Sequence, residues 1–260
     1  MSYASPVISP YAQSAYAVRC DWGPVGADAV GPGAAIVAVV DVLSFTTALT
    51  VAADNGIEVF PYRWRDERAA AFAAEHDAML AVGRQAVSPD QPVSLSPPTI
   101  RAARGITRLV LPSPNGSTVA RRLAETGATV IGVSLRNARA AATWVTRTLP
   151  AGAAVAVIPA GERWKHDDSL RPAAEDLWGA GAFLQGLFDE GLDGFSPEAE
   201  LAAAAYRQVA PHLRDALYAC ASGRELTGYG YPEDVGIASE VDSSNVVPVL
   251  DGEGFRPVQV

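Results

Sequence analysis

A single carboxylate, Asp41, follows a long apolar stretch of the chain. That stretch, residues 34–40, is continuously apolar rather than alternating, which predicts a strand buried on both faces of a parallel sheet. Ligands of open α/β sheets bind at the carboxyl ends of such strands. We therefore expect Asp41 to belong to an active site. The alternative is that it only caps the helix expected at 46–54.

A run of small polar residues at 112–118, PSPNGST, lies between a predicted strand and a predicted helix. Free backbone N–H groups, hydroxyls and the positive end of a helix dipole favour phosphate or sulfonate binding there. The predicted substrate-binding residues of this turn are Ser113, Asn115, Gly116, Ser117 and Thr118. The run matches neither the P-loop nor the dinucleotide-binding fingerprint, and a well-capped turn is the alternative.

Three further carboxylates come later, Glu162 after a predicted strand and Glu175 with Asp176 on the next predicted helix. Together with Asp41 they would supply the oxygen ligands that Mg²⁺ takes. Adjacent helix residues point about 100° apart, so we expect only one of Glu175 and Asp176 to join Glu162 at the ion. The alternative is that the pair only complements the helix dipole.

The residue at position 43 bears on the role of Asp41. An aspartyl-phosphate mechanism of the haloacid dehalogenase type would place a second aspartate two residues after the first, and this chain has Leu43 there. The sequence therefore favours metal binding by Asp41 over attack by its carboxylate.

The net charge of −9 argues against non-specific nucleic-acid binding, which needs a basic surface. An anionic substrate would be repelled at long range, so the site must supply positive charge locally. Arg84 and Arg224 are predicted to bind the distal anion of such a substrate, because a planar guanidinium suits a carboxylate or sulfonate. A surface ion pair is the alternative for Arg224.

Predicted strands and helices alternate through the first part of the chain. Strands are expected at 17–20, 34–40, 57–62, 78–82, 108–111, 129–133 and 154–158. Helices are expected at 46–54, 65–76 and 137–148, and a further one follows the run PSPNGST and ends at 125. Beyond these we expect a charged loop at 161–172, helices at 173–190 and from 197 to about 220, and strands at 246–250 and 255–260. The proline-rich stretch 88–98 is expected to be a loop, and no element is predicted in the Gly/Pro-rich stretch 23–33. This alternation predicts an α/β fold with a mainly parallel sheet flanked by helices.

Length and composition limit the possible domain organisation and location of the chain. A chain of 260 residues that is 49% hydrophobic can bury a large core, either as one domain over 1–260 or as two lobes at about 1–160 and 161–260. No apolar stretch approaches the roughly 20 residues of a membrane helix. The first residues lack the basic and apolar regions of a signal peptide, so the cytoplasm is the expected location.

Taken together, these features resemble the 2-phosphosulfolactate phosphatase family over about residues 34–250. The residues that carry the resemblance are Val40-Asp41-Val42-Leu43, Thr46-Thr47, Asn55-Gly56, Ser96-Pro97, Pro114-Asn115-Gly116-Ser117, Ala160-Gly161-Glu162, Glu175-Asp176, Gly179-Ala180-Gly181-Ala182, Ser222-Gly223-Arg224, Asp234, Asp242 and Val247-Pro248. The resemblance implies an unusual α/β architecture and a Mg²⁺-dependent phosphatase that releases sulfolactate and phosphate, a step that leads to coenzyme M in methanogens. It also implies a homo-oligomer, with a dimer as the expected form.

Three positions depart from the family pattern. Ser44-Phe45 stands where members commonly carry an arginine directly after Asp-Val-Leu, and Val82-Gly83-Arg84 lacks the glutamate of a Gly-Glu-Arg motif. Leu95 replaces an asparagine before Ser-Pro. These differences remove one positive charge and one carboxylate from the expected site.

The leading hypothesis is therefore a Mg²⁺-assisted phosphomonoester hydrolase acting on a small anionic substrate, with Asp41, Glu162 and Asn115 as catalytic residues. One alternative is a relative that binds an acidic metabolite without turnover. Another is a dinucleotide-dependent oxidoreductase, against which counts the lack of a Gly-x-Gly-x-x-Gly turn after any predicted strand.

Overall fold

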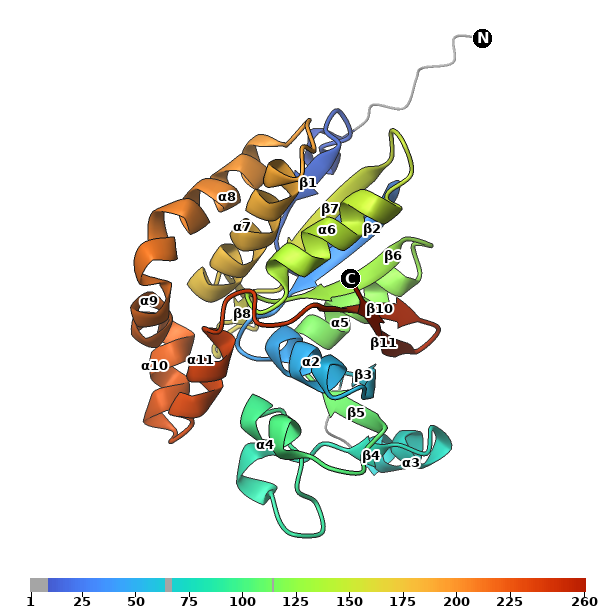
Figure 1. Cartoon of the computed structure of the whole chain (residues 1–260), viewed down its shortest axis with the longest axis vertical. Coiled ribbons are helices and arrows are strands. Elements are labelled where there is room, and N and C mark those ends of the chain that lie inside the picture. Colours follow the sequence, from blue (N-terminus) through green and yellow to red (C-terminus); the bar gives the residue numbers. More distant parts are fainter. Residues whose placement is uncertain (1–8, 64–66, 114) are drawn as a thin grey trace.

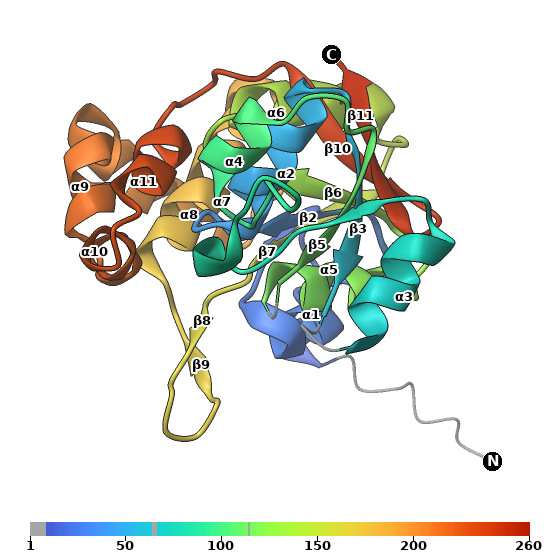
Figure 2. The same ribbon diagram turned by 90° about the horizontal axis from the view of Figure 1, so that it is seen from below.

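The computed structural model of the chain describes residues 9–63, 67–113 and 115–260, which form a large sheet flanked by helices (Figure 1). Within these residues the sheet has nine strands in the order β1-β7-β2-β6-β10-β11-β3-β5-β4. Their bounds are β1 Val18–Cys20, β2 Ala34–Val40, β3 Glu58–Tyr62, β4 Met79–Leu80, β5 Arg108–Pro112, β6 Thr129–Val133, β7 Ala154–Pro159, β10 Val246–Asp251 and β11 Gly254–Gln259. A separate hairpin of β8 (Glu162–Arg163) and β9 (Leu170–Arg171) extends away from the body (Figure 2).

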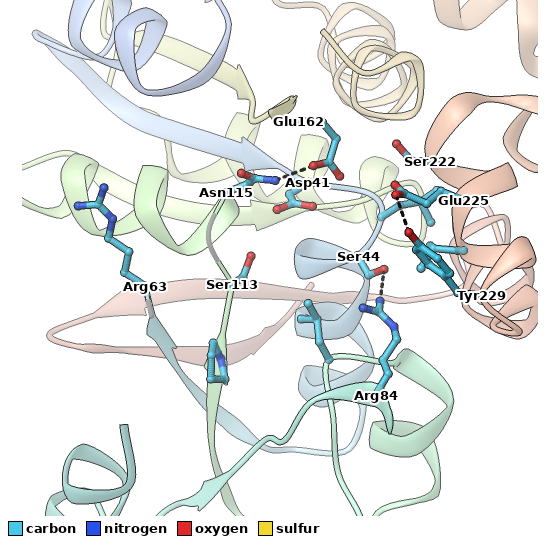
Figure 3. A pocket seen from close by; sticks show the side chains of 14 residues that line it. Asp41, Ser44, Arg63, Arg84, Ser113, Asn115, Glu162, Ser222, Glu225 and Tyr229 are labelled. Atoms are coloured by element: carbon cyan, nitrogen blue, oxygen red, sulfur yellow. Dashed lines mark hydrogen bonds between the residues drawn. The ribbon is translucent and has the colours of Figure 1, made fainter. Parts of the chain in front are cut away.

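The hairpin of β10 and β11 divides the sheet into two parallel sets, β1-β7-β2-β6 and β3-β5-β4. Antiparallel pairing of β6 with β10, β10 with β11 and β11 with β3 makes the second set run opposite to the first. In a flat sheet the carboxyl ends of the two sets would lie at opposite edges. Residues at the ends of β2 and β5 nevertheless line one cavity (Figure 3), so the sheet is far from flat. The predicted mainly parallel α/β fold is confirmed, with the antiparallel hairpin added.

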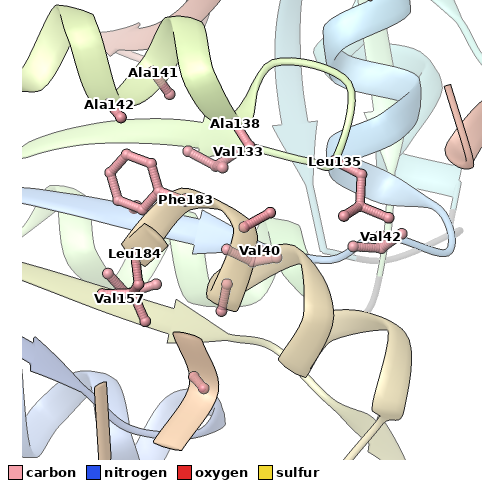
Figure 4. Packing of buried hydrophobic residues seen from close by; sticks show 14 of the residues in the cluster. Val40, Val42, Val133, Leu135, Ala138, Ala141, Ala142, Val157, Phe183 and Leu184 are labelled. Carbon is pink, nitrogen blue, oxygen red and sulfur yellow. The ribbon is translucent and has the colours of Figure 1, made fainter. Parts of the chain in front are cut away.

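Helices cover both faces of the sheet. Their bounds are α1 Gly23–Val30, α2 Phe45–Asp54, α3 Glu67–Glu75, α4 Pro97–Ala102, α5 Gly116–Ala124, α6 Ala138–Thr148, α7 Ala174–Asp189, α8 Pro197–Val209, α9 Leu213–Ala219, α10 Ala221–Gly228 and α11 Pro232–Ala238. Strand β2 is buried on both faces, as predicted. Ile36, Ala38 and Val40 belong to a core shared with α6, α7 and α8 (Figure 4), whereas Val37 and Val39 belong to a second core shared with α1, α2 and α5.

Several elements differ from the expected ones. Helix α1 lies in the stretch 23–33, for which no element was predicted, and α4 begins within the stretch 88–98, which was predicted to be a loop. The prolines that argued against helices there lie in the first two positions of each helix. Proline is favourable there, since its missing N–H has no partner at that position anyway and its fixed φ suits the helix. The expected loop at 161–172 contains the β8–β9 hairpin. The helix predicted at 65–76 is α3, and positions 65 and 66 lie outside the described residues.

The later helices α8 to α11 lie together on one side of the molecule (Figure 1). Helix α8 begins as predicted, with the Ser196 side chain accepting a hydrogen bond from Ala199 N at 3.2 Å and Pro197 in the first position. Helix α11 packs against α4, so the end of the chain contacts its first half. In the part of the chain that the structure describes, no helix has both the length and the apolar character needed to cross a membrane.

Close packing of α7 on β2 depends on Gly179. A Cβ atom at this position would lie 2.6 Å from Val42 Cγ2 and 2.9 Å from Val40 Cγ1. These distances are shorter than real Cβ contacts, so a larger residue would push the helix away from the strand. Glycine therefore lets α7 bring its first turn to the end of β2.

Replacing Gly179 by alanine is expected to lower the free energy of unfolding by about 1–3 kcal/mol, because the added methyl group overpacks the core. The matched control is Gly228→Ala in α10, where a Cβ would meet nothing within 4 Å. This control is expected to keep the wild-type stability or to gain up to about 1 kcal/mol. Urea unfolding measures both variants, and equal stabilities would contradict the packing.

Candidate active site

A cavity of about 480 Å³ opens where strand ends from both parallel sets meet (Figure 3). Five residues predicted from the sequence line it: Asp41 after β2, Arg84 in the short turn Arg84–Ala86, Ser113 and Asn115 after β5, and Glu162 in β8. The other lining residues are Leu43, Ser44, Arg63, Leu95, Pro112, Ser222, Glu225, Leu226 and Tyr229. The fold thus brings together residues that are up to 188 positions apart, counted from 41 to 229.

The Asp41 carboxylate lies between the first residues of two helices. Its Oδ1 accepts a hydrogen bond from Phe45 N of α2 at 3.3 Å, and its Oδ2 accepts one from Gly116 N of α5 at 2.8 Å. A Cβ at Gly116 would lie 2.7 Å from that Oδ2, so only glycine permits the approach. Burial, together with the charge of Glu175, nevertheless raises the pKa of Asp41 to about 6. Asp41 therefore both caps α2 and lines the cavity.

The hydroxyls that follow Asp41 have two different roles. Thr46 Oγ1 donates to Asp41 O at 2.8 Å and Thr47 Oγ1 donates to Val42 O at 2.7 Å, so both hold the strand-to-helix turn. Ser44 instead lines the cavity, and its Oγ accepts a hydrogen bond from Arg84 Nη2 at 2.9 Å. The Arg84 guanidinium therefore supplies positive charge beside position 44, where the family pattern has an arginine.

The two neighbouring acids of α7 are used differently. Asp176 Oδ1 accepts a hydrogen bond from Val42 N at 2.7 Å and its Oδ2 accepts one from Gly161 N at 2.9 Å, which ties the end of β2 to the end of β7. Burial raises the pKa of Asp176 well above its usual value, and the charge of Asp41 adds to this. Glu175 is 1% exposed, and its Oε2 accepts no hydrogen bond from the described residues. Glu175 is thus the acid of the pair with an unused oxygen.

Glu162 and Asn115, which the sequence assigned to one catalytic group, are in direct contact. Asn115 Nδ2 donates to Glu162 Oε2 at 2.9 Å (Figure 3). Burial, together with the charges of Asp41 and Glu175, raises the pKa of Glu162 to about 7, although the charge of Arg171 opposes this rise. Glu162 therefore gains or loses a proton near neutral pH.

Four predicted substrate-binding residues lie away from the cavity lining. The N–H of Gly116 is already donated to Asp41, and the buried hydroxyl of Ser117 donates to the backbone carbonyls of Ser113 and of Tyr62 in β3. Thr118 lines a neighbouring cavity, and Arg224 is exposed on α10. The turn at 112–118 thus differs from the phosphate-binding turn expected there, because the N–H of Gly116 at the start of α5 binds a carboxylate of the protein itself.

The sequence prediction missed several lining residues. Arg63 directly follows β3, so the strand-end rule that selected Asp41 also points to it. Ser222 lies in the Ser-Gly-Arg motif, and its Oγ accepts a hydrogen bond from Arg171 Nη2 at 3.2 Å. Tyr229, whose hydroxyl donates to Glu225 at 3.3 Å, carries no local signal, because the tertiary packing of α10 places both residues at the cavity.

The carboxylates of Asp41 and Glu162 at the cavity fit an ion that needs few protein ligands. Across residues 9–63, 67–113 and 115–260, no three His, Cys, Asp or Glu side chains are arranged so that they could hold one metal ion. Mg²⁺ commonly binds one or two carboxylates and completes its shell with waters and substrate phosphate. The two carboxylates at the cavity, Asp41 and Glu162, match that pattern, and the charge of buried Glu175 acts on both of them.

Comparison with known proteins assigns the class that such a site suits, the phosphoric monoester hydrolases. The chain belongs to the 2-phosphosulpholactate phosphatase family, whose model matches residues 29–253 and so includes every lining residue of the cavity. A protein of Thermus thermophilus, described as a probable 2-phosphosulfolactate phosphatase, is 32% identical over 224 residues. That alignment covers 84% of this chain and 88% of the relative.

We predict that, without divalent ions, the free energy of unfolding falls as the pH rises from about 4.5 to about 7.5, because buried acids of the folded protein have raised pKa values. The pKa values of Asp41, about 6, and of Glu162, about 7, lie above their ordinary values of 3.8 and 4.5. The folded protein therefore binds more protons than the unfolded chain in this range, and each proton lost on raising the pH costs stability. Glu175→Gln removes a charge that raises both pKa values, so it is expected to flatten the dependence.

Urea unfolding across this pH range measures the effect. The matched control is Glu200→Gln, which neutralises an exposed glutamate of α8 and is expected to keep the wild-type slope. A wild-type protein whose stability stays constant or rises over the range would refute the prediction.

Proposed function

We propose that the protein is a Mg²⁺-dependent phosphatase that hydrolyses 2-phosphosulfolactate to sulfolactate and phosphate. The observation that carries the proposal is that one cavity is lined both by the carboxylates of Asp41 and Glu162 and by the guanidinium groups of Arg84 and Arg63. Phosphosulfolactate carries a phosphate ester together with a carboxylate and a sulfonate, so it offers one anion for a cation held by the carboxylates and further anions for the arginines.

The negative charge of Asp41 and Glu162 is the reason to expect a bound cation. A phosphate ester brought against Asp41 and Glu162 would meet like charge in a partly buried place, where screening is weak. A divalent ion reverses that repulsion, and Mg²⁺ when bound would polarise the phosphoryl group and neutralise its developing charge. Asp41 and Glu162 would hold it, and the unused oxygen of Glu175 supports a cation in this region.

The remaining residues of the cavity orient the substrate in this proposal. Asn115 holds Glu162 through the 2.9 Å hydrogen bond and so fixes the carboxylate for ion binding. Ser113, which is 3% exposed and lines the cavity, is placed to contact phosphate oxygens. Arg84 and Arg63 would bind the anionic groups distal to the phosphate, because guanidinium pairs bidentately with oxyanions.

Phosphate release from 2-phosphosulfolactate is the deciding measurement. With Mg²⁺ we expect turnover, and we expect chelation of the ion or the variant Asp41→Asn to lower kcat/KM by about 100-fold or more, since the charge stabilisation is worth several kcal/mol. Asp251→Asn, an exposed acid paired with Arg256 outside the cavity, is the control and should match the wild type.

The outcomes separate the parts of the proposal. Undiminished turnover after complete chelation would remove the ion from the mechanism. No phosphate from phosphosulfolactate in the presence of Mg²⁺ would overturn the substrate, and thermal stabilisation by phosphosulfolactate without release would favour the non-catalytic binding protein.

A further inference from the structure

We propose that Asp234 of α11 is a positioning residue, which aims Arg84 at the anion distal to the phosphate and thereby sets a preference for phosphomonoesters that carry a second oxyanion. The inference rests on the proposed function, because it concerns the same cavity. It assigns a role in substrate selection to a helix that lies 150 positions beyond the arginine it holds.

The contacts of Asp234 fix its carboxylate completely. Its Oδ2 accepts a hydrogen bond from Arg84 Nε at 2.9 Å, and its Oδ1 accepts one from Ser96 Oγ at the start of α4. Asp234 is 1% exposed, and the Arg84 side chain is 18% exposed. A carboxylate buried to this degree is costly unless both oxygens are satisfied, and here both are.

The pairing leaves the other edge of the guanidinium for a ligand. Besides Nε, only Nη2 has a partner among the described residues, the Ser44 Oγ at 2.9 Å. A guanidinium has further N–H donors, and those of Arg84 lie at the cavity that this residue lines (Figure 3). Because Asp234 occupies Nε, the Nη edge is the one presented for bidentate binding of a carboxylate or sulfonate.

Arg84 needs such support because its own segment gives little. It lies in the three-residue turn Arg84–Ala86, which contains no buried residue. A long side chain on such a turn loses rotamer entropy when it is ordered on binding. The contacts with Asp234, together with the Tyr231 ring 5.6 Å from Arg84 Cζ, order the side chain beforehand.

The ligand class follows from this geometry. In the proposed function the phosphate lies at Asp41 and Glu162, so Arg84 contacts a second oxyanion of the substrate, and a substrate with a single phosphate gains nothing from it. The class is a small phosphomonoester with a carboxylate or sulfonate. Three substrates separate the possibilities: 2-phosphosulfolactate, 2-phospholactate, which lacks the sulfonate, and phenyl phosphate, which has no second anion.

The test compares kcat and KM of the Mg²⁺-loaded wild type with those of Asp234→Asn, Arg84→Ala and the double variant. Asp234→Asn is expected to raise KM for phosphosulfolactate about 10- to 100-fold, the size of one hydrogen bond to a charged group, and to leave kcat within about 3-fold. KM for phenyl phosphate should not change. The double variant should match Arg84→Ala, because both substitutions remove the same interaction.

Two further variants keep the result interpretable. Arg101→Ala breaks an arginine–glutamate pair with Glu240 outside the cavity, and it should leave all three substrates unaffected. Tyr231→Leu removes the ring and leaves Asp234 paired, so it carries the test if Asp234→Asn does not fold. We expect it to raise KM for phosphosulfolactate about 2- to 5-fold.

An equal loss of activity with all three substrates would show that Asp234 only stabilises the fold and would overturn the inference. The same would follow if Asp234→Asn lowered activity as much in the Arg84→Ala background as in the wild type. Should the wild type release no phosphate from phosphosulfolactate, the proposed function fails, and calorimetry with sulfolactate then decides the inference. Binding by the wild type that is lost in Asp234→Asn would support it, and no binding by the wild type would overturn it as well.

Discussion

The Asp41 carboxylate accepts two hydrogen bonds, and the second of them joins the two strand sets at the site. The first comes from Phe45 N at the start of α2, which like Asp41 follows β2 of the first set. The second comes from Gly116 N at the start of α5, which follows β5 of the second set. Because the two sets run in opposite directions, their carboxyl ends could not meet in a flat sheet. The absence of a side chain at Gly116 lets the helix start approach closely enough to make the second bond.

Placing several acids together at this point creates an electrostatic cost that the protein offsets only in part. Backbone N–H groups satisfy Asp41 and Asp176, and Asn115 satisfies one oxygen of Glu162. The pKa of Asp41 still rises to about 6 because burial outweighs those bonds, and one oxygen of Glu175 has no partner among the described residues. In a chain of net charge −9, Arg84 and Arg63 supply positive charge to the same cavity that Asp41 and Glu162 line.

The second half of the chain completes a site that begins in the first half. Helix α7 supplies Asp176, which ties the ends of β2 and β7, and α10 supplies Ser222 to the cavity wall. Helix α11 supplies Asp234, which holds Arg84. Helix α10 and the residue that follows it also place Glu225, Leu226 and Tyr229 at the cavity, whereas α7 and α11 act by orienting strand ends and side chains of the first 162 residues.

The sequence by itself determined the features that depend on local pattern: the buried strand β2, the carboxylate at its end, the alternation of strands and helices, and Asn115 and Glu162 as separate candidate residues. Strand burial and strand ends can be recognised within a few residues of the chain, since side-chain periodicity follows from backbone geometry. Only the tertiary structure decided that the two strand sets oppose each other, that the N–H of Gly116 serves Asp41, and that Arg63 lines the cavity while Arg224 does not. Those outcomes depend on hairpin pairing and helix packing between distant segments, and on the direction of long side chains, which no local spacing fixes.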